Sequence, residues 1–170
     1  VEGQVIAFQR PDQISDASSD NRLWAYTDLP TMGIRIIADD VIESSAGDEV
    51  ILPGTDGHLR ILSASGALLL DKTVSSGALY TAAVANGSSG QTVIATAGVD
   101  GFIYFLNTAG TQLAKVSPKT ENSSGVSGLI RHVLAGDFDG NGIDELISFV
   151  NHKAFSGHCF FDITDLATYQ

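Results

Sequence analysis

The feature that most constrains the fold of this chain is an internal repeat with a period of 44 residues. Asp56-Gly57 recurs as Asp100-Gly101, and Gly66 recurs as Gly110. Two separate turn signals therefore return at the same spacing, within segments 49–73 and 92–116 that resemble one another. Such self-similarity predicts that the chain builds one supersecondary unit repeatedly.

Within each copy, apolar and polar residues alternate with a period of two, which is typical of half-buried β-strands. The Asp-Gly pairs lie between two such segments, where a tight primed hairpin turn is expected. The pattern predicts two four-stranded antiparallel modules at residues 34–74 and 79–117. A partial module is expected at residues 1–30, and an incomplete one at residues 129–163.

Four strands per unit and a period near 44 residues are typical of β-propeller blades. We therefore predict an all-β, single propeller-like domain over residues 1–170. About three modules are fewer than a propeller usually has. The chain is thus expected to be an arc of a larger propeller, or to be completed by oligomerisation, and to associate with further blades. Val93, Ile94, Ile103 and Leu106 of the middle module should be buried. The alternative is a β-sandwich.

Composition narrows the classes of partner. The 170 residues carry a net charge of −11, with a pI near 4.4. Such a chain repels phosphate backbones, so neither nucleic acid nor an anionic membrane is an expected partner. Its sequence contains neither a signal-peptide pattern nor a long apolar segment, so no membrane insertion is expected. Cys159 is the only cysteine, which excludes an internal disulfide.

The most specific motif is "DFDGNGIDE", residues 137–145, between two apolar segments. Counting from Asp137, side-chain oxygens stand at positions 1, 3, 5 and 9, on Asp137, Asp139, Asn141 and Glu145. The carbonyl of Ile143 falls at position 7. Calcium prefers six to eight such oxygens, and glycines permit the sharp turn that gathers them. These five residues are the predicted ligands of one Ca²⁺ ion; the alternative is a solvated acidic turn.

An EF-hand loop begins similarly, but it needs a glutamate at position 12, where this chain has Ser148, and helical flanks. "DFDGNGIDEL" instead resembles the FG-GAP or VCBS repeats, which carry D-x-[DN]-G-[DN]-G-x-x-[DE]-[LI] between the first two strands of a blade. The resemblance covers about residues 34–163. It implies calcium-binding propeller blades, found in integrin-like heads, bacterial surface proteins and carbohydrate-binding propellers.

The corresponding segments of the other modules depart from that pattern. Residues 39–50 keep Gly47, Asp48 and Glu49 without the alternating acids, so an ion around Asp39, Asp40 and Glu43 remains an open question. Residues 84–93 have no carboxylate, and no ion is expected there.

Other candidate side chains have simpler interpretations. His152, His158 and Cys159 could bind zinc, but their spacing is not characteristic and packing is the preferred interpretation. His132 and Asp137 are near in sequence but would face opposite sides of a strand. The aromatic residues could form a sugar-stacking platform, although packing between blades is the more common use. They are Trp24, Tyr26, Tyr80, Phe102 and Tyr104.

The leading hypothesis of function is a non-catalytic, calcium-stabilised binding or adhesion module that contacts a polysaccharide or another protein. The expected location is secreted, periplasmic or on the cell surface, because millimolar extracellular calcium fills even a weak site. The alternative is a propeller segment of a polysaccharide lyase or glycoside hydrolase, and a third possibility is a purely structural scaffold.

Overall fold

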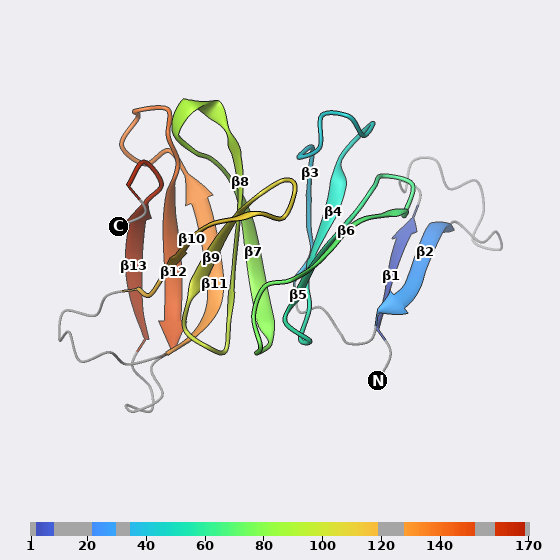
Figure 1. Cartoon of the computed structure of the whole chain (residues 1–170), viewed down its shortest axis with the longest axis horizontal. Helices are drawn as coiled ribbons and strands as arrows, with labels where there is room; N and C mark the ends of the chain where they lie inside the picture. The colour runs from blue at the N-terminus through green and yellow to red at the C-terminus, as the bar shows by residue number, and fades with distance from the viewer. Residues whose placement is uncertain (1–2, 9–21, 30–34, 119–127, 152–158, 169–170) are drawn as a thin grey trace.

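The structure is a computed structural model, and it describes residues 3–8, 22–29, 35–118, 128–151 and 159–168. Antiparallel strands dominate these residues and form four separate sheets (Figure 1). The only helical segment among them is a short 3-10 turn at Ser88–Gly90. The predicted all-β class is therefore confirmed.

Each sheet is built from strands that follow one another in the chain. The first sheet contains β1 (Gly3–Phe8) and β2 (Arg22–Leu29). The second contains β3 (Ile37–Asp39), β4 (Glu49–Pro53), β5 (His58–Leu62) and β6 (Leu68–Thr73). The third contains β7 (Leu79–Asn86), β8 (Thr92–Gly98), β9 (Ile103–Asn107) and β10 (Gln112–Val116). The fourth contains β11 (Leu129–Gly136), β12 (Glu145–Asn151) and β13 (Cys159–Asp165).

The repeated Asp-Gly pair does connect the two central strands of a sheet, but not through a two-residue primed turn. Gly57 has a φ of 82°, whereas Asp56 is not among the residues with positive φ. The Gly54 N–H donates to the His58 carbonyl (2.8 Å), and the Gly57 N–H donates to the Gly54 carbonyl (3.0 Å). The loop is longer than expected because only the glycine takes the left-handed conformation.

Gly57 is also required by its surroundings. A Cβ at this position would lie 2.0 Å from the carbonyl oxygen of Ser75. The Gly57 carbonyl accepts the N–H groups of Val74 (2.9 Å) and Ser75 (3.1 Å), which lie in the segment leading to the next sheet. The Asp-Gly turn therefore holds the connection between successive sheets.

The hydrophobic core of the described residues lies between the sheets, in three clusters. The third sheet is buried on both faces, because successive side chains of a strand point to opposite sides. Ile94 packs toward the second sheet and Ala95 toward the fourth, and both side chains are fully buried. Val93, Ile94, Ile103 and Leu106 are at most 1% exposed, which confirms the predicted burial.

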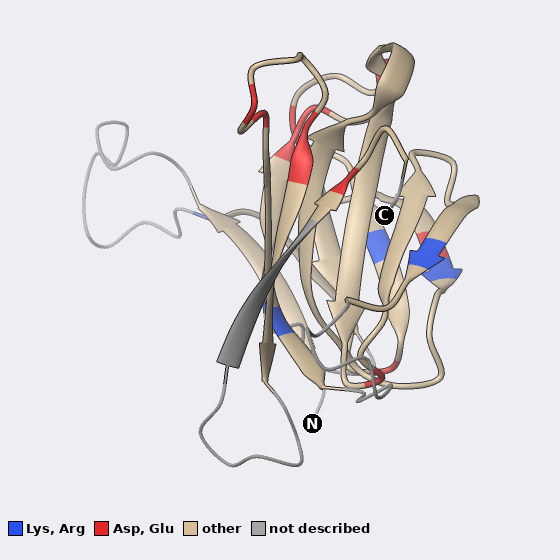
Figure 2. Ribbon diagram, turned by 90° about the vertical axis from the view of Figure 1, so that its left-hand side faces the viewer, with Lys and Arg blue, Asp and Glu red and all other residues tan. Residues whose placement is uncertain are grey.

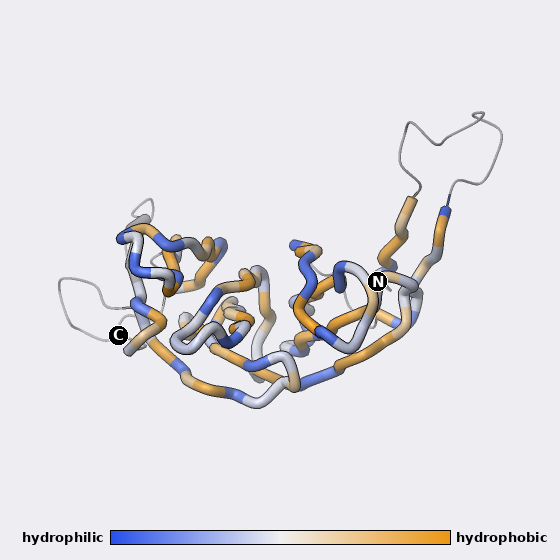
Figure 3. The backbone as a smooth tube through the Cα atoms, turned by 90° about the horizontal axis from the view of Figure 1, so that it is seen from above, coloured by the Kyte–Doolittle hydropathy of each residue, from blue (hydrophilic) through white to orange (hydrophobic). Residues whose placement is uncertain are grey.

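The sheets follow one another along an arc (Figure 3). The first strands of the second, third and fourth sheets lie next to one another. β7, the first strand of the third sheet, contacts β3 of the second sheet and β11 of the fourth. Radially arranged sheets with neighbouring first strands define an arc of a β-propeller. The alternative of a β-sandwich is wrong, because a sandwich has two facing sheets rather than a series.

The aromatic residues mostly pack between sheets instead of forming a platform. Tyr104 is 5% exposed, and Phe102 packs against the same cluster. Trp24 and Tyr26 pack against the cluster between the first two sheets. The Trp24 indole N–H donates to the Ala64 carbonyl (2.8 Å), which attaches β2 to the second sheet.

In the fourth sheet, β13 is described from Cys159 onward, because residues 152–158 lie outside the described part of the chain. β11 ends at Gly136, one residue before the acidic loop. Within the described ranges, no helix has the length and apolar character needed to span a membrane.

Candidate metal centre

The acidic loop connects β11 to β12, the first two strands of the fourth sheet. Gly136 pairs with Glu145 across the antiparallel ladder, so the ladder closes the loop at its base. Gly140 and Gly142 have φ values of 81° and 84°, a conformation that favours glycine. The sequence Gly-x-Gly thus allows a compact loop between two strands.

Three carboxylates converge inside this loop. Asp137, Asp139 and Glu145 each offer an oxygen within 4.8 Å of the others. At that separation, two unit charges repel by roughly 3–4 kcal/mol with an effective dielectric constant near 20. Asp137 and Asp139 are exposed, whereas Glu145 is only 8% exposed. A cation at their centre would offset the repulsion.

Backbone amides hold Asp137 in place. One carboxylate oxygen accepts the N–H groups of Gly140 (2.7 Å) and Asn141 (3.0 Å), and the other accepts that of Gly142 (3.0 Å). Glu145 accepts the N–H of Phe138 at 2.9 Å. These bonds pre-form the loop, since the carboxylates are already oriented by main-chain donors.

Asn141 makes local hydrogen bonds. Its Nδ2 donates to Asp139 (2.9 Å), and its Oδ1 accepts the N–H of Ile143 (2.7 Å). In this arrangement Asn141 braces Asp139, and its side chain would have to turn to bind an ion. The Ile143 side chain packs against the core between the third and fourth sheets and anchors the loop. The roles of Asn141 and of the Ile143 carbonyl as ligands stay predictions.

Asp144 connects the acidic loop to the third sheet through two hydrogen bonds with Asn86. Its Oδ2 accepts the N–H of Asn86 (2.7 Å), and its own N–H donates to the Asn86 carbonyl (2.9 Å). Asn86 is the last residue of β7, so this pair connects the acidic loop to the third sheet. No local pattern in the motif indicates this contact, because Asn86 lies 58 positions from Asp144.

The corresponding loop of the second sheet is organised differently. Glu49 occupies the position of Glu145, since it pairs with Asp39 at the base of the loop. Its Oε2 accepts the N–H groups of Val41 (3.0 Å) and Ile42 (2.9 Å), and the side chain is fully buried. Here the glutamate serves as an acceptor for the loop backbone.

Glu49 is charged in this position. Burial raises the pKa of the Glu49 carboxyl, but hydrogen bonds from the Ser45 hydroxyl and the Ile42 and Val41 amides outweigh it and hold the pKa below its ordinary value.

Among the described residues, the cluster at Asp137 is the only one in which three candidate ligand atoms meet within 4.8 Å. Asp39, Asp40 and Glu43 do not form a comparable cluster.

Several acidic residues gather at one end of the sheets, where the β3–β4 and β11–β12 loops lie (Figure 2). His132 does not join Asp137: its Nδ1 lies 3.4 Å from Arg35, and its ring lies 6.4 Å from that of Phe149. His152 and His158 lie outside the described residues, as does the side chain of Cys159.

The separate sheets arranged along an arc define the class of this chain: it is a β-propeller protein. Residues 2–128 match the lambda-carrageenase beta-propeller domain, and because this match covers most of the chain, the chain belongs to that family. The family is a propeller family, as expected, but a different one from the FG-GAP and VCBS repeats. The match ends before Asp137, so the acidic loop lies outside it.

Comparison with solved structures agrees on the fold. A structure described as the Dos1 propeller matches with a TM-score of 0.51 and 17% sequence identity. The match covers 71% of this chain and 30% of that one. At this identity the likeness shows the fold alone. No curated protein matches the sequence.

Proposed function

We propose that this chain is a propeller segment of a polysaccharide-degrading glycoside hydrolase. The observation that carries the proposal is the match of residues 2–128 to the lambda-carrageenase beta-propeller domain. That match favours the hydrolase alternative over the adhesion module that led the sequence analysis.

The carboxylates described here suit a supporting function within such an enzyme. Glycoside hydrolysis generally uses two carboxyl groups about 5–10 Å apart that flank the scissile bond. In this chain Asp137 and Glu49 accept backbone amides, and Asp56 pairs with Arg60 at 2.7 Å. Groups engaged in this way stabilise loops and sheets. We therefore assign this segment to support or substrate positioning.

Export from the cell follows from the proposal. A polysaccharide is too large to cross a membrane, so an enzyme that degrades it must meet it outside the cytoplasm. The proposed location is therefore secreted, periplasmic or on the cell surface. Calcium is available there at millimolar concentration, which suits the acidic loop.

The test is an assay of the complete gene product on lambda-carrageenan, with agarose as a neutral galactan control. Release of reducing ends from lambda-carrageenan and not from agarose is the expected result. Binding to the polysaccharide without release of ends would favour the adhesion or binding hypothesis instead. A product that neither binds nor cleaves would contradict both.

We propose further that the loop at residues 137–145 binds one Ca²⁺ ion. The convergence of Asp137, Asp139 and Glu145 within 4.8 Å supports this. The ion would connect β11 to β12 and fix the loop that contacts Asn86 in the third sheet. Magnesium should substitute poorly, because it requires a tighter octahedral shell and loses its waters reluctantly.

Thermal melting in EDTA and in millimolar calcium tests the site. Calcium at a hundred times Kd should stabilise the native chain by about 2.7 kcal/mol. Asp137→Ala should abolish most of this difference, because it removes one charged ligand. Asp48→Ala is the matched control, since Asp48 is an exposed acid of the β3–β4 loop, and it should keep the calcium response. If calcium changed the thermal stability of the native chain and of Asp137→Ala equally, the loop would be a solvated acidic turn and not a calcium site.

A further inference from the structure

Two arginines lie at the first strands of neighbouring sheets. Arg35 precedes β3 by two residues, and Arg131 belongs to β11; the strand between these two, β7, contacts both. Arg35 is half-buried and Arg131 is exposed. Among the described residues, neither guanidinium forms an ion pair, whereas the buried Arg60 pairs with two aspartates. No described carboxylate therefore neutralises the charge of Arg35 or of Arg131.

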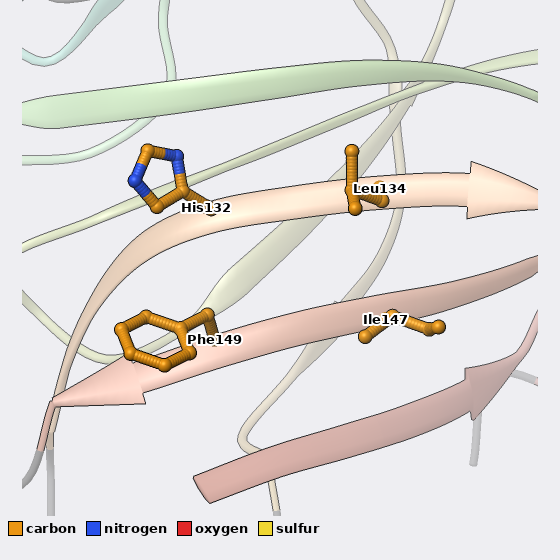
Figure 4. A pocket seen from close by; sticks show the side chains of 4 residues that line it. All are labelled: His132, Leu134, Ile147 and Phe149. Carbon is orange, nitrogen blue, oxygen red and sulfur yellow. The ribbon is translucent and has the colours of Figure 1, made fainter. Parts of the chain in front are cut away.

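His132 brings Arg35 to the segment that carries Arg131. The Nη1 atom of Arg35 lies 3.4 Å from His132 Nδ1, although the two residues are 97 positions apart. Because a guanidinium can only donate, Nδ1 is the acceptor and the imidazole carries its proton on Nε2. Figure 4 shows His132 beside Phe149, its partner across the β11–β12 ladder. The exposed imidazole thus adds an N–H donor to those of the arginines.

A bulge in β11 sets the direction of Arg131. The pairing of β11 with β12 passes from Ile130 to His132 while β12 advances by one residue, so Arg131 is the extra residue. Bulges of this kind re-aim a side chain and are common next to binding sites. Here the guanidinium carbon of Arg131 lies 5.5 Å from the centroid of the Tyr80 ring in β7. The ring covers one face of the guanidinium, and its in-plane N–H groups stay available to a ligand.

This basic cluster is separated from the acidic loop. β11 begins at Leu129, close to Arg131, and the acidic loop follows its last residue, Gly136. Five residues of extended strand span about 16 Å. Charges in water are screened over about 8 Å at physiological salt. The cluster can therefore attract an anion locally, although the chain as a whole has a net charge of −11.

We propose that Arg35, Arg131 and His132 form a subsite that binds the sulfate ester groups of a polysaccharide. A guanidinium presents a planar fork of N–H donors that matches two oxygens of an oxyanion, and such charge-assisted hydrogen bonds are the strong ones. The donors come from both sides of β7, so the subsite exists only when the second, third and fourth sheets have packed together. The inference rests on the proposed function for the source of the anion, a sulfated galactan.

Calorimetric titration of the complete gene product tests the subsite. The ligand is a short sulfated oligosaccharide from acid hydrolysis of lambda-carrageenan, compared with the same oligosaccharide after desulfation and with inorganic sulfate at equal ionic strength. Arg35→Gln and Arg131→Gln should each raise the Kd of the sulfated oligosaccharide about tenfold or more. Arg131→Lys keeps the charge without the fork and should give a smaller loss.

Lys72→Gln is the matched control, because Lys72 is an exposed cation on the outer strand β6. Its Kd should change less than about twofold. The desulfated oligosaccharide should bind weakly and should not distinguish the variants. Circular dichroism of each variant checks that the fold is retained.

Several results would overturn the subsite. They are absence of binding by the native product, unchanged affinity in both glutamine variants, an equal loss in Lys72→Gln, and equal binding of the desulfated oligosaccharide. Inorganic sulfate bound as tightly as the oligosaccharide would assign the arginines to a free anion instead. Release of reducing ends with unchanged affinity in the variants would contradict the subsite and keep the proposed hydrolase. Arginine-dependent binding without release would support the subsite and contradict the hydrolase.

Discussion

At the scale of single residues, the second sheet contains a buried ion pair between Arg60 and Asp56. The third sheet has a neutral donor, the phenol of Tyr104, at the position equivalent to Arg60. Arg60 is 3% exposed, and its guanidinium donates to Asp56 at 2.7 and 3.2 Å. It also donates to Asp71 at 3.1 Å. At the equivalent positions, 44 residues later, the Tyr104 hydroxyl donates to Asp100. A guanidinium in one sheet and a phenol in the next thus donate to equivalent aspartates, Asp56 and Asp100.

This equivalence leads to a prediction about Arg60. Arg60→Ala should lower the free energy of unfolding by roughly 3–5 kcal/mol, because it leaves a largely buried carboxylate without its partner. Arg60→Tyr should cost clearly less, since a phenol can reach Asp56 as Tyr104 reaches Asp100. Urea denaturation of the three proteins measures both values. Equal losses for the two variants would show that the charge itself is required.

Glu49 supports a second prediction at this scale. Because its pKa is lower in the folded state, its contribution to stability is present above the unfolded pKa of about 4.3 and is lost as the pH falls through the folded value. Glu49→Gln should cost roughly 1–3 kcal/mol at pH 7, and the difference from the native chain should narrow below pH 4. Urea titrations at the two pH values measure it. Asp48→Asn, a substitution at an exposed position next to Glu49, is the control variant.

At the scale of secondary-structure elements, the contact between the β7–β8 and β11–β12 loops depends on Asp144 and Asn86. Asp144→Ala should remove one hydrogen bond to a charged acceptor and lower stability by about 1–3 kcal/mol. Asp144→Asn retains an acceptor and should cost less. Neither substitution should abolish calcium binding, because Asp144 is engaged with Asn86. Melting curves measure the stability of both variants, and calorimetric titration measures their calcium binding. If Asp144→Ala lost calcium binding to the same extent as Asp137→Ala, Asp144 would belong among the ligands.

The elements also show what local sequence could and could not predict. Strand alternation and the 44-residue repeat predicted the sheets, since both are consequences of backbone geometry over a few residues. The Asp-Gly turn was predicted in place but not in type. Its conformation depends on Gly57 receiving the connection through Ser75, which comes from outside the turn.

At the scale of the whole molecule, the sheets are attached to one another unequally. Among the described residues, the cluster between the third and fourth sheets contains twelve buried residues, whereas the one between the first two sheets contains four. Burial of apolar area contributes about 25 cal/mol per Å², so the smaller cluster contributes much less to stability. The β1–β2 hairpin is therefore the part expected to detach first.

The only tryptophan of the chain, Trp24, reports on that hairpin. We predict that its fluorescence changes at a lower urea concentration than far-UV circular dichroism, which follows all the sheets. Leu29→Ala, in the small cluster, should widen the gap between the two transitions. Coincident transitions in the native chain would mean that the first sheet unfolds together with the rest.

The sequence by itself determined the strand pattern, the repeat, the double burial of the third sheet and the gathering of acids at residues 137–145. Each follows from spacing along the chain, because side chains alternate on a strand and turn residues act over three or four positions. Tertiary structure decided that Asp144 meets Asn86, that Glu49 is buried, and that Arg35 meets His132. These depend on how segments distant in sequence are positioned by the packing of one sheet on the next, and no local pattern encodes that position.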